Sequence, residues 1–193
     1  MADVLLFHHT IGLTPGLVEL ADRWRAAGHT VHTPDLFGGR TFASIDEGVA
    51  FTQSPDAPDF GAIAQEEAER LPAGLVYAGV SFGVMLAQRL AQLRPGAAGA
   101  LLFESCLPIT GDWSVGPWPE SVPVQVHGKD ADPFFAGEGD IDAARAIVAS
   151  APDAELFTYP GTEHLFVDSS LPSYDGEATA LATERVLAFL ARV

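Results

Sequence analysis

Short runs of consecutive apolar residues alternate along the chain with segments whose apolar residues recur at helical spacing. The apolar runs predict six strands, at residues 4–7, 30–33, 75–80, 98–103, 122–126 and 155–159. The helical spacing predicts five helices, at residues 15–27, 63–71, 84–93, 140–148 and 178–190, with Asp140 as a candidate N-cap. Strands that alternate with helices are typical of an α/β fold, so we expect about six mostly parallel strands with helices on both faces of the sheet.

Length and composition limit what such a fold can do. A chain of 193 residues is most simply a single domain, residues 1–193, and it can bury a core without disulfide bonds, which its one cysteine, Cys106, cannot form internally. A net charge of −16 would repel nucleic acid and anionic lipid surfaces, so neither is an expected partner. The acidic N-terminus lacks a secretory pattern and no apolar segment reaches the roughly 20 residues that span a bilayer, so we expect a cytoplasmic protein.

The segment Gly79-Val80-Ser81-Phe82-Gly83 joins a predicted strand to a predicted helix. It has the form G-x-S-x-G, in which the glycines allow a sharp turn and the central serine is exposed in a strained conformation. The helix that follows directs its first N–H groups and the positive end of its dipole toward the same place. The pattern is typical of a nucleophilic serine, and its position between a strand and a helix makes it more specific than the five letters alone.

Partners for Ser81 are expected after other strands, because the carboxyl ends of parallel strands meet at one edge of the sheet. A serine hydroxyl needs an imidazole to accept its proton, and His164 follows the last predicted strand. The imidazole in turn needs a carboxylate, and both Asp130 and Asp132 follow the strand before it. Either aspartate gives the chain order serine, aspartate, histidine that α/β-hydrolases require.

With these residues the chain resembles the dienelactone hydrolase family of the α/β-hydrolase fold, over nearly its whole length. The segments that carry the resemblance are residues 9–13, 34–37, 79–83, 132–134 and 164–166. The resemblance implies a compact α/β-hydrolase fold without a cap domain and a catalytic triad of Ser81, Asp132 and His164, which favours Asp132 over Asp130. It also implies an oxyanion hole formed by the backbone amides of Thr10 and Phe82.

The chain departs from the family pattern at several positions. Family members that cleave dienelactone use a cysteine nucleophile where this chain has Ser81, and His9 stands where they have a glutamate. Arg40 matches one of the arginines that hold the substrate carboxylate, whereas Asp168 stands near the position of another. We therefore treat His9 and Arg40 as candidate substrate-binding residues, and a neutral ester becomes as good a candidate substrate as an anionic lactone.

The sequence thus leads to one main hypothesis and two rivals. The main hypothesis is a serine hydrolase that cleaves a small carboxylic ester or lactone through an acyl-enzyme intermediate, with no cofactor and no metal. A thioesterase or a general carboxylesterase would use the same triad. A non-catalytic binding protein could keep the same fold, but it would not need competent side chains at all three triad positions.

Overall fold

The computed structural model of the protein describes all 193 residues. Its core is one sheet of six strands, all parallel, in the order β2-β1-β3-β4-β5-β6. The strands are β1 (Asp3–Phe7), β2 (Thr30–His32), β3 (Leu75–Val80), β4 (Gly99–Phe103), β5 (Val124–Lys129) and β6 (Ala154–Tyr159). The prediction of an α/β fold with about six mostly parallel strands is confirmed.

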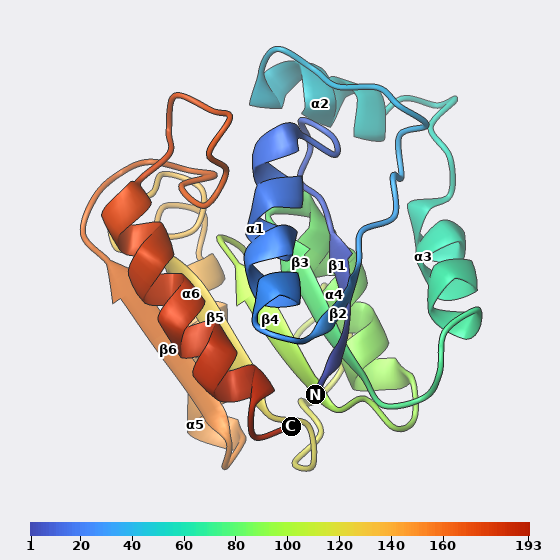
Figure 1. Cartoon of the computed structure of the whole chain (residues 1–193), viewed down its shortest axis with the longest axis vertical. Coiled ribbons are helices and arrows are strands. Elements are labelled where there is room, and N and C mark those ends of the chain that lie inside the picture. The colour runs from blue at the N-terminus through green and yellow to red at the C-terminus, as the bar shows by residue number, and fades with distance from the viewer.

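Six helices surround the sheet. They are α1 (Pro15–Ala26), α2 (Ile45–Thr52), α3 (Phe60–Glu69), α4 (Phe82–Leu93), α5 (Asp140–Ser150) and α6 (Gly176–Leu190). Helices α1 and α6 pack on one face of the sheet and α3, α4 and α5 on the other, as predicted, while α2 lies beyond the carboxyl ends of the strands (Figure 1). No helix is both long enough and apolar enough to cross a membrane.

The two faces of the sheet alternate along each strand, as the pleat requires. In β1, Val4 and Leu6 belong to the apolar layer under α1 and α6, whereas Leu5 and Phe7 belong to the layer under α3, α4 and α5. Because both faces are covered, the four inner strands β1, β3, β4 and β5 are buried over nearly their whole length, which explains their continuous apolar runs, whereas the edge strands β2 and β6 are mostly half-buried.

Helix α2 is absent from the sequence-based prediction. Its apolar residues do not form a long amphipathic stripe, and only Gly48 of its eight residues is buried. The helix is instead marked at its start: the Ser44 side chain accepts a hydrogen bond from the amide of Glu47, and the Glu47 carboxylate accepts one from the amide of Ala43. This is close to a capping box, and the S-x-x-E spacing at Ser44 was the available signal.

The bounds of several elements shift by a few residues, and the bounds of β5 and the cap of α5 differ from the prediction for clear physical reasons. Strand β5 runs from Val124 to Lys129 rather than over residues 122–126, because Pro123 has no amide hydrogen for the ladder while Lys129 still pairs with Tyr159 of β6. Helix α5 is capped by Gly139, whose φ is 99°, rather than by Asp140. The Asp140 carboxylate accepts hydrogen bonds from Ser105 Oγ (2.6 Å) and the amide of Cys106 (3.0 Å) instead.

The strand order places the loops that could form a site. The chain passes from β1 to β2 on one side of β1 and returns to β3 on the other side, so the order reverses between β1 and β3. Ligands of open α/β sheets bind at such a reversal, outside the carboxyl ends of the strands. The loops that leave β1, β3, β4, β5 and β6 all open at this edge, which is also where α2 lies.

Candidate active site

Ser81 occupies a strained turn between β3 and α4. Its φ is 49° and its ψ is −114°, a conformation that non-glycine residues rarely adopt. The flanking glycines are required by close packing: a Cβ on Gly79 would lie 2.4 Å from the carbonyl carbon of Gly83, and a Cβ on Gly83 would lie 2.3 Å from the carbonyl oxygen of Phe7. The turn is therefore pressed against the end of β1, and the serine side chain is directed into the space above the sheet.

Ser81, His164 and Asp132 form a continuous hydrogen-bonded chain. His164 Nε2 lies 2.9 Å from Ser81 Oγ, and His164 Nδ1 lies 2.6 Å from Asp132 Oδ2. The partners imply that Nδ1–H donates to the carboxylate and that Nε2 accepts from the serine hydroxyl. Asp130 does not take part, since its Oδ1 accepts a hydrogen bond from the amide of Gly161. The structure thus brings the three candidate triad residues together and separates the alternative acid from them.

The surroundings of His164 favour its charged form. Burial alone would lower the pKa of the imidazole, but the hydrogen bond that it donates to Asp132 and the negative charges of Glu104 and Asp132 outweigh burial, so the pKa is raised above its ordinary value. The ring of Phe134 lies 4.6 Å from the imidazole ring, centre to centre, and shields one side of it. Such an imidazole is suited to accept a proton from Ser81.

Two backbone amides beside Ser81 have no hydrogen-bond partner within the protein. One belongs to Phe82, the first residue of α4, where the positive end of the helix dipole adds to the field. The other belongs to Thr10, which follows β1, and the buried hydroxyl of Thr10 is also without a partner. Both residues line the cavity that contains Ser81. Donors in this position can stabilise an oxyanion.

The cavity above Ser81 has a volume of about 250 Å³. Its lining includes Ile45, Val49, Thr52 and Gln53 from α2 and its C-cap, and Met85 and Phe134 from the opposite side. Helix α2 is seated directly on the loop after β1, because a Cβ on Gly48 would lie 2.0 Å from the carbonyl oxygen of Thr10. The charged groups of the lining are three carboxylates, those of Glu104, Glu138 and Asp140, and no lysine or arginine belongs to it.

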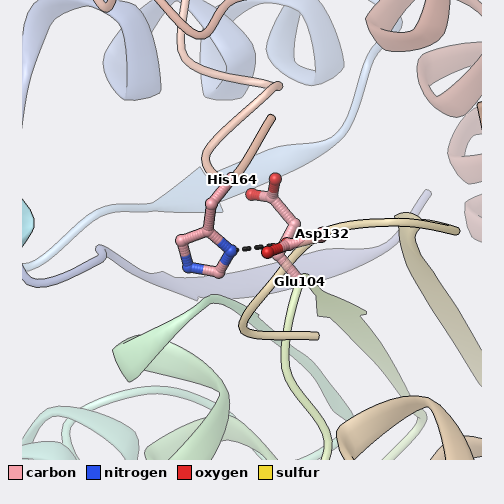
Figure 2. Close-up of side chains that lie close together, drawn as sticks. All are labelled: Glu104, Asp132 and His164. Carbon is pink, nitrogen blue, oxygen red and sulfur yellow. Dashed lines mark hydrogen bonds and ion pairs between the residues drawn. The ribbon is translucent and has the colours of Figure 1, made fainter. Parts of the chain in front are cut away.

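Glu104 is a member of the site that the sequence-based reasoning missed. It follows β4 with a φ of 61°, and its side chain is 1% exposed. Figure 2 shows its carboxyl group next to Asp132, beside the His164 imidazole. Burial raises the pKa of Glu104 to about 7. The available signal was a glutamate placed directly at the end of a continuous apolar strand.

The same three side chains would also qualify by residue type as metal ligands. One ligand atom each of Glu104, Asp132 and His164 lies within 4.8 Å of the others. The closest pair, His164 Nδ1 and Asp132 Oδ2, is 2.6 Å apart. Two ligands that each lie about 2.0–2.2 Å from a tetrahedral metal ion are separated by clearly more than this distance. The pair shares a proton, and we assign no metal to the cluster.

The two candidate substrate-binding residues do not reach the cavity. His9 is fully buried, and its Nε2 lies 2.8 Å from Oδ2 of Asp168 beneath the loop after β1. Arg40 lies on the outer surface, where its guanidinium carbon is 5.4 Å from the centre of the Phe51 ring, and it lines a different hollow together with Asp35 and Asp56. The sequence-based assignment of His9 and Arg40 to substrate binding is therefore corrected.

The family model of the dienelactone hydrolases matches residues 2–193 of the chain. The chain belongs to the dienelactone hydrolase family. As a member of this family it is a hydrolase that acts on ester bonds. Among curated proteins, none matches its sequence.

Three solved structures of similar fold are each distant from this dienelactone hydrolase family member in sequence. A protein of Klebsiella pneumoniae subsp. pneumoniae, provisionally named a dienelactone hydrolase, is 20% identical with a TM-score of 0.72, over 100% of this chain and 88% of that one. A dienelactone hydrolase-like promiscuous phosphotriesterase from metagenomic libraries is 18% identical with a TM-score of 0.73, over 100% and 86%. A thermophilic esterase of Thermogutta terrifontis is 17% identical with a TM-score of 0.64, over 99% and 83%.

Proposed function

We propose that the protein is a serine hydrolase that cleaves small, neutral carboxylic esters or lactones through an acyl-enzyme intermediate, with residues 1–193 acting as one catalytic domain. The observation that carries the proposal is the unbroken hydrogen-bonded chain from Ser81 Oγ through the His164 imidazole to Asp132 Oδ2, with distances of 2.9 and 2.6 Å. The membership of the dienelactone hydrolase family supports it independently.

In the proposed acylation, Ser81 Oγ attacks the carbonyl carbon of the ester while His164 Nε2 takes the hydroxyl proton. Asp132 keeps His164 in the tautomer that leaves Nε2 free and stabilises the imidazolium once it forms. The tetrahedral intermediate places its oxyanion at the amides of Phe82 and Thr10. Each such donor typically contributes about 3–4 kcal/mol to transition-state stabilisation. The imidazolium then protonates the leaving alcohol as the C–O bond breaks.

In the proposed deacylation, the same groups act on water. His164 Nε2 accepts a proton from a water molecule, whose oxygen attacks the acyl carbonyl, and the oxyanion returns to the two amides. Collapse of this intermediate breaks the bond to Ser81 Oγ, which regains its proton from His164. The carboxylic acid product releases its proton to solvent and leaves as a carboxylate. Every proton is accounted for by the triad and water, so the proposed cycle uses no cofactor.

The charge of the cavity supports a neutral substrate. Its lining contains the carboxyl groups of Glu104, Glu138 and Asp140 and no lysine or arginine that could pair with a substrate carboxylate. The position near which the family resemblance places a substrate-binding arginine is Asp168, which is fully buried. The carboxylate of an anionic dienelactone would therefore face three acidic side chains with no lysine or arginine to neutralise it, a repulsion that a neutral ester avoids.

The proposal is tested by covalent labelling and by hydrolysis of an activated ester. We expect a fluorophosphonate probe to label the parent protein at Ser81 and to leave Ser81→Ala unlabelled. The Thermogutta esterase, which has a similar fold, is itself phosphorylated by paraoxon. We also expect the parent, and not Ser81→Ala, to hydrolyse p-nitrophenyl acetate. A parent protein that is folded, unlabelled and inactive toward activated esters would refute the proposed function.

The rival functions make different predictions in the same assays. A thioesterase would be labelled at Ser81 as well, but its kcat/KM would be higher for an acyl thioester than for the matching oxygen ester. A binding protein would be labelled weakly or not at all, and its parent and Ser81→Ala forms would be equally inactive. Comparison of ester, thioester and lactone with the same acyl group therefore separates the three.

A further inference from the structure

Glu104 has one more oxygen than its structural contacts require. Its Oε1 accepts a hydrogen bond of 2.8 Å from the amide of Phe166, two residues after His164. Its Oε2 is buried and has no partner in the protein. An unpartnered buried carboxyl oxygen is costly, and an amide or hydroxyl could have held Phe166 without introducing an ionisable group. The side chain is also held by a backbone with a φ of 61°.

We propose that Glu104 is a second acid of the catalytic centre, a positioning residue that acts on the reaction through the charge of His164. The inference rests on the proposed function of Ser81 and His164. A ligand atom of Glu104 lies within 4.8 Å of both His164 and Asp132, so a negative charge on it stabilises the imidazolium from a second direction. Glu104 forms no bond with substrate, and no proton leaves the triad through it.

The other charged groups around Glu104 leave His164 as its natural counterpart. Asp132 comes from the loop after β5, and Asp140 and Glu138 come from α5 and the segment before it. These three are acidic, and the adjoining residue of β5, His127, is fully buried with a pKa lowered to about 3 by burial. His164 is thus the group near Glu104 that acquires a positive charge during the proposed reaction.

Glu104 changes its charge in the range where the triad works. Burial raises its pKa to about 7, against the opposing attraction of His164 and the hydrogen bond from Phe166. Below this pH the side chain is neutral and supports His164 only as an acceptor for the loop. Above it, the carboxylate makes His164 a stronger base for the serine proton. The two groups therefore titrate as a coupled pair, and the acid limb of the pH–rate profile belongs to both.

The direct test is the pH dependence of ester hydrolysis by Glu104→Gln. Glutamine keeps the shape and the oxygen that accepts from Phe166, but it removes the charge. We expect the acid limb of kcat/KM to move to lower pH by about one unit, because the imidazolium loses a stabilising charge. Glu66→Gln, on the exposed face of α3, removes the same charge far from the site and should leave the limb in place. An unchanged limb in an active, folded Glu104→Gln would overturn the inference and leave only a structural role.

A second measurement does not depend on the variant. In parent protein labelled with ¹³C at glutamate Cδ and histidine Cε1, we expect the signals of Glu104 and His164 each to report the titration of the other. Independent single-step titrations of the two groups would contradict the proposal even if Glu104→Gln failed to fold. The two proposals fail in distinguishable ways. If the fluorophosphonate probe does not label the parent at Ser81, the proposed function itself is refuted. If the parent is active but the acid limb of Glu104→Gln does not move, only the role of Glu104 is refuted.

A third test combines Glu104→Gln with Asp132→Asn in a double-mutant comparison. Asp132→Asn leaves Glu104 as the nearest remaining acid of the centre, so the additional change Glu104→Gln should lower kcat/KM by a larger factor in the Asp132→Asn background than in the parent. Equal factors in both backgrounds would show that the two acids do not act on the same imidazole, and the inference would fail.

Discussion

Nε2 of His9 lies 2.8 Å from Oδ2 of Asp168, and both side chains are fully buried. These are two of the positions at which the chain departs from the dienelactone hydrolase pattern, and in this protein they are each other's partners. Asp168 also accepts hydrogen bonds from the side chain of Thr14 and from Ser170. The pair ties the loop after β1, which carries Thr10, to the loop that carries His164.

Replacement of Asp168 by asparagine should destabilise the fold and loosen both loops. Burial would raise the pKa of Asp168, but the hydrogen bonds from His9, Ser170 and Thr14 outweigh it and lower the pKa to about 2. We expect Asp168→Asn to lower the free energy of unfolding by about 2–3 kcal/mol at pH 7, because an amide group replaces an ionised acceptor among donors. Urea unfolding at pH 7 measures the loss.

The pH dependence of this difference has a definite sign. The folded pKa of Asp168 lies below the ordinary value of 3.8, so its contribution is fully present above pH 4 and is lost as the pH falls toward 2. The difference between parent and Asp168→Asn should therefore be constant from pH 7 to about pH 5 and shrink below pH 4. A difference that grew on acidification would rule out this explanation.

The two candidate acids of the triad should respond very differently to the same substitution. Asp132 touches His164, so Asp132→Asn should lower kcat by about 10³- to 10⁴-fold through loss of the correct tautomer. Asp130 accepts only from the amide of Gly161, so Asp130→Asn should leave kcat within a few-fold of the parent. Steady-state hydrolysis of p-nitrophenyl acetate measures both. If Asp130→Asn lowered kcat more than Asp132→Asn, Asp130 would have to be the acid of the triad.

Glu104 should make the parent less stable at alkaline pH than its glutamine variant. Its folded pKa of about 7 exceeds the ordinary value of 4.5, so the folded state binds more protons between these limits and loses stability as the pH rises through them. The total loss is about 3 kcal/mol. Glu104→Gln lacks this term, so its stability relative to the parent should rise between pH 5 and 8, as measured by urea unfolding. A pH-independent difference would mean that the carboxyl group is not perturbed.

The glycine at the end of the nucleophile motif should tolerate no side chain. A Cβ on Gly83 would lie 2.3 Å from the carbonyl oxygen of Phe7, and neither the first turn of α4 nor the end of β1 can move away without breaking its own backbone hydrogen bonds. Gly83→Ala should destabilise the fold by about 2–3 kcal/mol and lower kcat, since it displaces the end of β1 that leads to Thr10. Gly176→Ala is the matched control: there a Cβ would meet nothing closer than 3.5 Å, at the start of α6, and thermal unfolding should show no loss.

The acidic cavity should discriminate between esters by charge. A neutral alkyl ester should have a kcat/KM at least about tenfold higher than an isosteric half-ester that carries a carboxylate, because Glu104, Glu138 and Asp140 repel the latter. Added salt should reduce this ratio by screening the exposed part of the repulsion, while the rate with the neutral ester stays nearly constant. Equal kcat/KM values for the neutral ester and the half-ester at low salt would mean that the substrate carboxylate does not lie near these three acidic side chains.

The sheet was predictable because burial on both faces leaves a clear trace in the sequence. The run at residues 75–80, for example, is continuously hydrophobic, so the strand could be located from the sequence. The alternation of such runs with helical patterns then gave the order of the elements along the chain. The proposed triad was also accessible, since parallel strands deliver Ser81, Asp132 and His164 to one edge regardless of the details of packing. The sequence separated Asp132 from Asp130 only through the family resemblance, and the side-chain directions after β5 supplied the geometric reason.

The remaining parts of the site depended on contacts that no local pattern encodes. The sequence places His9 next to the site mouth, but whether its side chain turns toward substrate or toward Asp168 is decided by residues 159 positions apart. Glu104 resembles an ordinary loop glutamate until β4 is seen to end beside His164. Helix α2 is short and mostly exposed, so hydrophobic periodicity could not reveal it, and only the capping pattern at Ser44 marks it.

The seating of α2 on Thr10 also defines how the protein could be redesigned. Gly48 has to remain glycine, since it contacts the backbone that presents the Thr10 amide, whereas Ile45, Val49, Thr52 and Gln53 contribute side chains to the cavity wall without belonging to the sheet. A combinatorial library over those four positions would reshape this wall of the cavity while leaving the six-stranded sheet unchanged. The short, exposed helix α2 is therefore the element to mutate in directed evolution of ester preference.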